Sequence, residues 1–127
     1  VSDIGFNPYA SVLITTEKTI REQPELVRSI VSASVRGWAE YLTDPTAVNA
    51  AIHGMNREMS PDALAYGASA MAPLCQVGDG RPLCDMTLER WQTLVRQIEE
   101  VDDIIPGSVK PEECFTTQFL ASAKTAE

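Results

Sequence analysis

Few side chains in this sequence are of the types that carry out chemistry. His53 is the only histidine, and the three cysteines are Cys75, Cys84 and Cys114. None of the cysteines has the paired spacing of a zinc site, and no nucleophile or carboxylate stands at a telling spacing from His53. His53 would either act as a base or cap the end of a helix, and the composition favours the cap. We therefore expect no catalytic residues, no metal site and no cofactor in this chain.

Cys75 and Cys84 have a second possible role, as a disulfide. They flank a segment rich in turn-forming residues, including Gly78 and Gly80. A turn there brings the two residues together, and an oxidising compartment would join them. The alternative is that both are small apolar side chains with no bond between them. Cys114 would then remain as a buried thiol.

Polar groups suited to ligand binding occur near the start of the sequence. Asn7 offers a donor and an acceptor, and Tyr9 offers an aromatic face with a hydroxyl. Such groups suit a small polar ligand, so Asn7 and Tyr9 are candidate ligand-binding residues. The alternative is an ordinary turn built around Asn7 and Pro8. The acidic pairs at 99–100 and 102–103 are interpreted as the solvated face of a helix.

The composition of the chain indicates what class of protein carries these residues. The chain has 127 residues, of which 44% are hydrophobic and 22% charged, as in a single folded domain. Its net charge of −8 disfavours nucleic acid as a partner. The sequence contains no apolar run long enough to span a membrane. It begins at Val1 without a visible signal peptide, so we expect that a leader has been removed or that the chain starts inside a larger protein.

One segment, residues 9–16, is predicted to be a strand. Its consecutive apolar residues Val12, Leu13 and Ile14 indicate burial on both faces, as in a parallel or mixed sheet. No partner strand is evident in the remaining sequence. This indicates that the sheet lies in sequence outside the 127 residues.

Everything after residue 16 has helical patterning. Caps and prolines predict helix starts near residues 17, 24, 45, 61, 88 and 111, the last of them running to about residue 120. Trp38, Tyr41 and Trp91 lie on the apolar faces of these helices and are interpreted as core residues. A loop is expected at 78–82 and a frayed tail at 122–127.

The order of four motifs resembles one family, the solute-binding proteins that serve ABC importers for aliphatic sulfonates, nitrate, taurine and thiamine-pyrimidine precursors. The resemblance covers residues from about 4 to 120. The motifs are the strand and helix start at 12–17 and 22–27, the residues Ala33, Gly37, Trp38, Asp44 and Pro45, the Met-Thr and Arg-Trp segment at 86–95, and the closing segment at 111–120.

The resemblance implies a periplasmic-binding-protein-like (type II) α/β fold, in which two lobes close on a small ligand. This segment would be mainly α-helical with one prominent strand. Residues 1–127 would form the C-terminal part of the two-lobe protein. Within it, residues 1–16 would hold the crossover and strand, residues 17–121 the helical part of the first lobe, and residues 122–127 the tail.

The resemblance also implies a function. The protein would bind a small solute in the periplasm or another extracytoplasmic space and deliver it to the permease subunits of an ABC-type importer. Asn7 and Tyr9 would lie near the crossing between the lobes, close to the ligand. Two alternatives remain. One is an enzyme on the same fold in thiamine-pyrimidine or sulfonate metabolism, and the other is a self-contained helical interaction domain whose helices alone cover residues 12–14.

Overall fold

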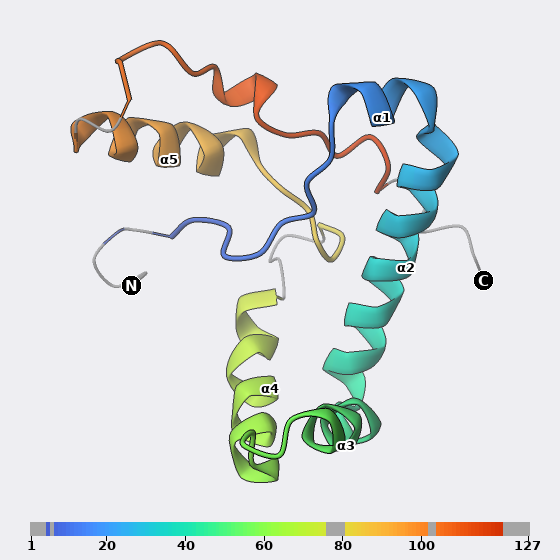
Figure 1. The fold of residues 1–127 in the computed structure, drawn as a ribbon. Coiled ribbons are helices and arrows are strands. Elements are labelled where there is room, and N and C mark those ends of the chain that lie inside the picture. The colour runs from blue at the N-terminus through green and yellow to red at the C-terminus, as the bar shows by residue number, and fades with distance from the viewer. Residues whose placement is uncertain (1–4, 6, 76–80, 102–103, 121–127) are drawn as a thin grey trace.

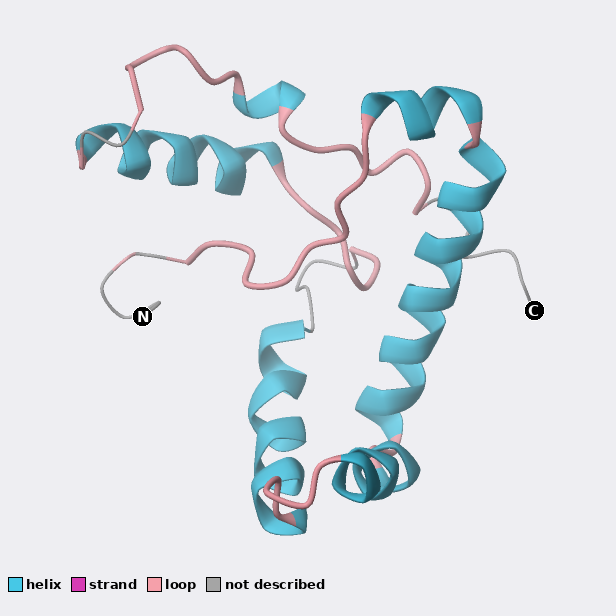
Figure 2. Ribbon diagram, in the orientation of Figure 1, coloured by secondary structure: helices cyan, strands magenta, loops and turns pink. Residues whose placement is uncertain are grey.

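The computed structural model describes residues 5, 7–75, 81–101 and 104–120. In these residues the chain folds into helices joined by loops (Figures 1 and 2). The helices are α1 (Glu17–Glu22), α2 (Pro24–Thr43), α3 (Thr46–Met55), α4 (Pro61–Cys75), α5 (Leu88–Glu100) and the short 3₁₀ helix η2 (Pro111–Glu113). The mainly helical prediction is confirmed. The expected tail at 122–127 and most of the expected loop at 78–82 lie outside the described residues.

Side-chain caps explain why most of these helices begin where they do. In each case a hydroxyl or carboxylate oxygen accepts a hydrogen bond from a backbone N–H of the first turn, which has no partner inside the helix. The bonds run from Thr19 N to Thr16 Oγ1 (3.1 Å), Thr46 N to Asp44 Oδ1 (3.0 Å), Ala63 N to Ser60 Oγ (3.2 Å) and Arg90 N to Thr87 Oγ1 (3.3 Å). Helix α3 consequently starts at Thr46, one residue later than predicted.

The predicted strand at 9–16 is wrong, because the described residues contain no strand. The backbone of residues 10–15 makes no hydrogen bond to any other described residue. Ile14 is 89% exposed and Leu13 is 61% exposed. A strand needs a neighbouring strand to pair its N–H and C=O groups, and the rest of the described chain offers only helices and loops.

The last predicted helix is also shorter than expected. A 3₁₀ turn at Pro111–Glu113 replaces the helix predicted to run to residue 120. Thr116 accepts a hydrogen bond from Gln118 N at 3.3 Å, and Leu120 N donates to Thr117 O at 3.0 Å. Such local bonds compete with helical ones and turn the chain instead.

The helices form two groups. Helix α2 contacts α1 and α4, and α3 contacts α4, whereas α5 contacts η2 (Figure 1). The N-terminal segment runs between the two groups in this view. No described helix has the length and apolar character needed to cross a bilayer.

The hydrophobic core of this arrangement is thin. Six hydrophobic residues are buried among those described, and no described side chain is less than 2% exposed. The buried residues are Val27, Leu64, Ala68, Val95, Phe119 and Leu120. The accessible surface is 9432 Å², whereas a compact monomer of this mass exposes about 6,700 Å². The chain therefore exposes much more surface than a compact monomer of the same mass.

Candidate functional site

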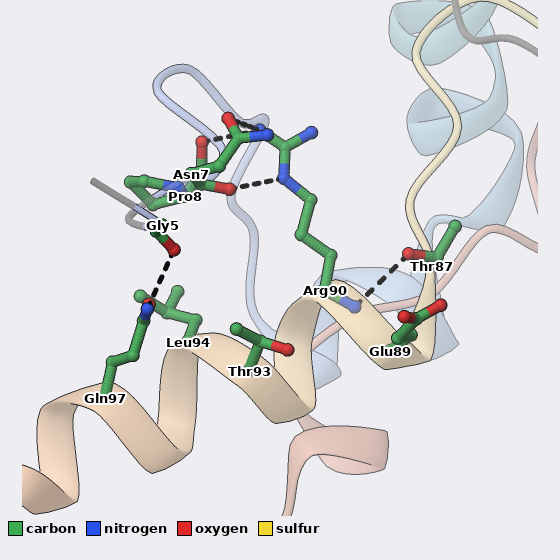
Figure 3. A pocket seen from close by; sticks show the side chains of 9 residues that line it. All are labelled: Gly5, Asn7, Pro8, Thr87, Glu89, Arg90, Thr93, Leu94 and Gln97. Atoms are coloured by element: carbon green, nitrogen blue, oxygen red, sulfur yellow. Dashed lines mark hydrogen bonds between the residues drawn. The ribbon is translucent and has the colours of Figure 1, made fainter. Parts of the chain in front are cut away.

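The N-terminal segment at residues 5–9 is fastened to helix α5 by Arg90. Its Nε donates to Asn7 O at 2.6 Å, and its Nη2 donates to Asn7 Oδ1 at 2.9 Å and to Pro8 O at 2.8 Å (Figure 3). The planar guanidinium presents these donors in a fixed fork, so one side chain fixes two residues of the segment. We call these contacts the Arg90 clamp.

Tyr9 and Gln97 extend the clamp at its two ends. The Arg90 guanidinium carbon lies 4.0 Å from the centre of the Tyr9 ring, and Thr87 N donates to the Tyr9 hydroxyl oxygen at 2.8 Å. Gln97 Nε2 donates to Gly5 O at 2.9 Å (Figure 3). The segment is therefore held along more than two turns of α5, from its capping residue to Gln97.

Helical spacing explains why these side chains meet the segment together. Arg90, Thr93 and Gln97 stand at i, i+3 and i+7 and so lie along one side of α5. Figure 3 shows Arg90 and Gln97 rising from the helix toward the N-terminal segment. The apolar side chain of Val95 faces another way and is buried.

A pocket of about 200 Å³ lies between the segment and the helix. Its lining is mostly polar and consists of Gly5, Asn7, Pro8, Thr87, Glu89, Arg90, Thr93, Leu94 and Gln97 (Figure 3). Arg90 has no carboxylate of a described residue within ion-pair distance, so its charge stays uncompensated apart from neutral acceptors and the Tyr9 ring. Such a lining can hold a small polar molecule by hydrogen bonds.

Three aromatic rings, those of Tyr9, Trp91 and Phe115, pack in a row next to the Arg90 clamp. The Trp91 ring centre lies 5.8 Å from that of Tyr9 and 5.7 Å from that of Phe115, to which it is nearly parallel. These contacts agree with the interpretation of Trp91 as a packing residue rather than a ligand contact. The indole N–H is buried and has no hydrogen-bond partner among the residues that the structure describes.

Of the two predicted ligand-binding residues, Asn7 lines this pocket and Tyr9 does not, although the Tyr9 ring lies against Arg90. Polar groups of both residues are occupied by the clamp. Asn7 Oδ1 accepts from Arg90, and the Tyr9 hydroxyl accepts from Thr87 N. The sequence interpretation missed Arg90, although Arg90 lies within the motif at 86–95. The available signal was a set of polar residues along one side of an otherwise amphipathic helix.

The other chemically capable residues lie elsewhere. A ring nitrogen of His53 is 2.8 Å from Met59 O, so this side chain ties the end of α3 to the loop before α4. Cys75 and Cys84 are both free thiols. The prediction that Cys114 is buried is wrong: it is exposed and its Sγ donates to Lys110 O at 3.4 Å, because the single 3₁₀ turn that carries it covers little surface. No group of three metal-ligating side chains occurs among the described residues.

Comparison with known proteins gives one match. Residues 1–48 match the model of the family described as NMT1/THI5 like. No curated protein and no solved structure matches the chain. The family match covers the N-terminal segment, α1 and α2, and so includes Asn7 and Tyr9 but not α5. For that part of the chain it supports a resemblance to solute-binding proteins, without indicating a particular member.

Proposed function

We propose that this chain belongs to an extracytoplasmic protein that binds a small solute and delivers it to an ABC-type importer. The observation that carries the proposal is the family match over residues 1–48. The pocket is consistent with it, because its polar lining suits a small hydrophilic molecule. On this proposal the chain takes part in ligand capture rather than catalysis.

The proposal includes a place for the chain within a larger molecule. Residues 1–127 form the C-terminal part of a two-lobe protein with a type II binding-protein fold, residues 1–16 being the crossover between the lobes. Two observations support this. The surface exceeds that of a compact monomer by roughly 2,700 Å², and residues 10–15 leave their backbone groups unpaired by any other described residue. A sheet supplied by the rest of the protein would satisfy both.

The proposal also assigns roles to the site residues. Asn7 contributes its side-chain amide nitrogen to the ligand, since only its oxygen is engaged by Arg90. Tyr9 acts indirectly, because its ring lies under the guanidinium and its hydroxyl is bonded to Thr87 N. The pocket forms one wall, and the other lobe supplies the opposite wall when it closes.

Calorimetric titration of the full-length gene product and of the isolated 127-residue chain tests this function. The titrants are an aliphatic sulfonate, taurine, nitrate and a thiamine-pyrimidine precursor. We expect the full-length protein to bind one of them with micromolar affinity and the isolated chain to bind none, because one wall leaves a ligand largely hydrated. The proposal would be contradicted if neither protein bound any of the four compounds. It would also be contradicted if the two proteins bound them equally well.

A substitution at Asn7 tests whether this side chain contacts the ligand. Asn7→Ala in the full-length protein should weaken binding by roughly tenfold, about 1–2 kcal/mol, through the loss of a hydrogen bond to the solute. Gln92→Ala is the matched control, since Gln92 is exposed on α5 and does not line the pocket. Equal affinities for the wild type and Asn7→Ala would remove Asn7 from the binding site.

A further inference from the structure

One nitrogen of the Arg90 guanidinium takes no part in the clamp. The Nε hydrogen is donated to Asn7 O, and Nη2 donates to Asn7 Oδ1 and to Pro8 O. The remaining nitrogen, Nη1, carries two further N–H donors, and neither has a partner among the residues that the structure describes. Nη1 accordingly has no dashed line in Figure 3.

The positive charge of Arg90 also lacks a counter-charge. Within the described part of the chain its partners are backbone carbonyls, an amide oxygen and the face of the Tyr9 ring, all of which are neutral. Arg90 is half-buried, so solvent and salt screen its charge less than that of a fully exposed side chain. A half-buried cation with free N–H donors is suited to an anion.

Asn7 supplies donors of the same kind beside Arg90. Its Oδ1 accepts from Arg90 Nη2 at 2.9 Å, which leaves the amide nitrogen Nδ2 without a partner among the described residues. Both side chains line the pocket. Carboxylate, sulfonate and phosphate groups have several oxygens that accept hydrogen bonds from neighbouring N–H donors, and bonds to an ionised donor are the stronger ones.

Glu89 is the one other charged residue in the pocket lining, and its carboxylate opposes an anion. Glu89 is exposed whereas Arg90 is half-buried. Because screening by solvent reduces the field of an exposed charge more than that of a half-buried one, the positive charge has the larger effect inside the pocket. The pocket therefore favours anions over cations.

The rest of the lining sets the size and character of the molecule. A volume of about 200 Å³ corresponds to about seven water molecules at roughly 30 Å³ each. Leu94 offers an apolar surface for a short carbon chain, and Thr93 offers a hydroxyl. These dimensions suit a small aliphatic acid and exclude a nucleotide or a peptide.

We propose that the solute carries an oxyanion, a carboxylate, sulfonate or phosphate group, which binds to Arg90 Nη1 and Asn7 Nδ2. Arg90 then has two tasks, holding residues 7–8 through Nε and Nη2 and selecting the charge of the solute through Nη1. This inference rests on the proposed function for the solute as a whole, whereas the anion site rests on the contacts of Arg90 alone.

Calorimetric titration with matched acid and amide pairs tests the selection. The titrants for the full-length gene product are butanoate against butanamide and ethanesulfonate against ethanesulfonamide, since the members of a pair differ in charge and little in shape. We expect at least one acid to bind about tenfold or more tightly than its amide. Equal affinities within both pairs would overturn the proposal.

Arg90→Gln separates selection from positioning. It removes the charge and the clamp together, so it should weaken binding of the acid and bring the acid-to-amide affinity ratio close to one. A residue that only positions the N-terminal segment would weaken both members of a pair equally and leave that ratio unchanged, which would refute the anion site. Arg96→Gln is the matched control, because Arg96 is exposed on α5 and does not line the pocket.

Glu89→Gln tests the same electrostatics without touching the clamp. The Glu89 side chain makes no hydrogen bond or ion pair with another described residue, so the clamp stays intact. Removing its negative charge should raise the affinity for the acid severalfold and leave that for the amide unchanged. Unchanged affinity for the acid would contradict an anion in this pocket.

Inorganic sulfate separates this inference from the proposed function. In the full-length protein, we expect sulfate to shift the nuclear magnetic resonance signal of the Arg90 Nε–H group saturably and to leave that of Arg96 unchanged. An unshifted Arg90 signal in a protein that binds a neutral thiamine-pyrimidine precursor would refute the anion site alone. A saturable shift in a protein that binds none of the organic solutes would instead refute the proposed function alone.

Discussion

Trp91 combines extensive ring contact with a buried indole N–H that has no acceptor in the described part of the chain. Trp91→Phe keeps most of the ring packing and removes the unsatisfied donor, so it should change the free energy of unfolding by less than about 1 kcal/mol. Trp91→Ala removes the ring and should cost about 3–5 kcal/mol. Urea denaturation followed by far-ultraviolet circular dichroism measures both. Equal losses for the two variants would mean that the indole N–H has a partner.

A second prediction at the scale of a single residue concerns Asp44, whose contribution to stability should depend on pH. Hydrogen bonds from the Thr46 side chain and, to a lesser extent, from its backbone N–H lower the pKa of Asp44 below its ordinary value of 3.8. The carboxylate therefore stabilises the start of α3 above that ordinary value, and the contribution is lost as the pH falls through the lower, folded-state pKa. Asp44→Ala should reduce stability at neutral pH and should reduce it by less in strongly acidic solution, where the charge of Asp44 is gone.

Denaturation midpoints of the wild type and Asp44→Ala at neutral pH and at about pH 2 check this prediction. Asp44→Asn is the control, because the amide oxygen still caps the helix and carries no charge that acid can remove. A difference between wild type and Asp44→Ala that persists unchanged at the acidic pH would contradict the assignment.

Residue types alone pointed to Asn7 and Tyr9 but not to Arg90. An asparagine followed by a proline is typical of a polar turn. For an arginine on an amphipathic helix, the neighbouring sequence does not predict which residue it contacts. Arg90 meets Asn7 across 83 positions of sequence. A contact of this separation follows from the packing of two segments and not from a local pattern.

At the scale of elements, helix starts were predictable because each depends on a few adjacent residues. Asp44 and Ser60 each precede a proline, and each accepts a backbone N–H of the helix that follows. The segment at 9–16 was mispredicted because its β-branched residues favour a strand only when another strand lies beside it. Local sequence gives that preference and cannot provide the partner.

The Arg90 clamp is the element-scale contact most open to test. Arg90→Lys keeps the charge and removes the fork that bonds Asn7 and Pro8, so it should loosen residues 5–9 by about 1–3 kcal/mol. Hydrogen exchange at Thr87 N–H, which donates to Tyr9, should quicken accordingly. Arg96→Lys is the matched control on the exposed side of α5. Unchanged exchange at Thr87 in Arg90→Lys would exclude the clamp as the contact that holds the segment.

At the scale of the whole molecule, the chain exposes more surface than its mass predicts. An uncovered surface of roughly 2,700 Å² beyond that of a compact monomer is of the size removed in an obligate interface. The exposure of this segment has a counterpart in the sequence, where Val12, Leu13 and Ile14 favour burial on two faces while no other segment has the pattern of a strand. The small size of the core could not be predicted from the sequence. Helical periodicity identifies the apolar face of a helix, but it does not show how much of that face is buried by other elements.

Hydrogen–deuterium exchange of the backbone amides of Val12, Leu13 and Ile14 tests the central claim most directly, that this chain is completed by a sheet from the rest of a larger protein. The measurement compares the isolated 127-residue chain with the full-length gene product. We predict exchange near the unprotected rate in the isolated chain, where these amides have no partner among the described residues, and slowing by roughly a hundredfold or more in the full-length protein. Slow exchange in the isolated chain, or equally fast exchange in both, would contradict the account.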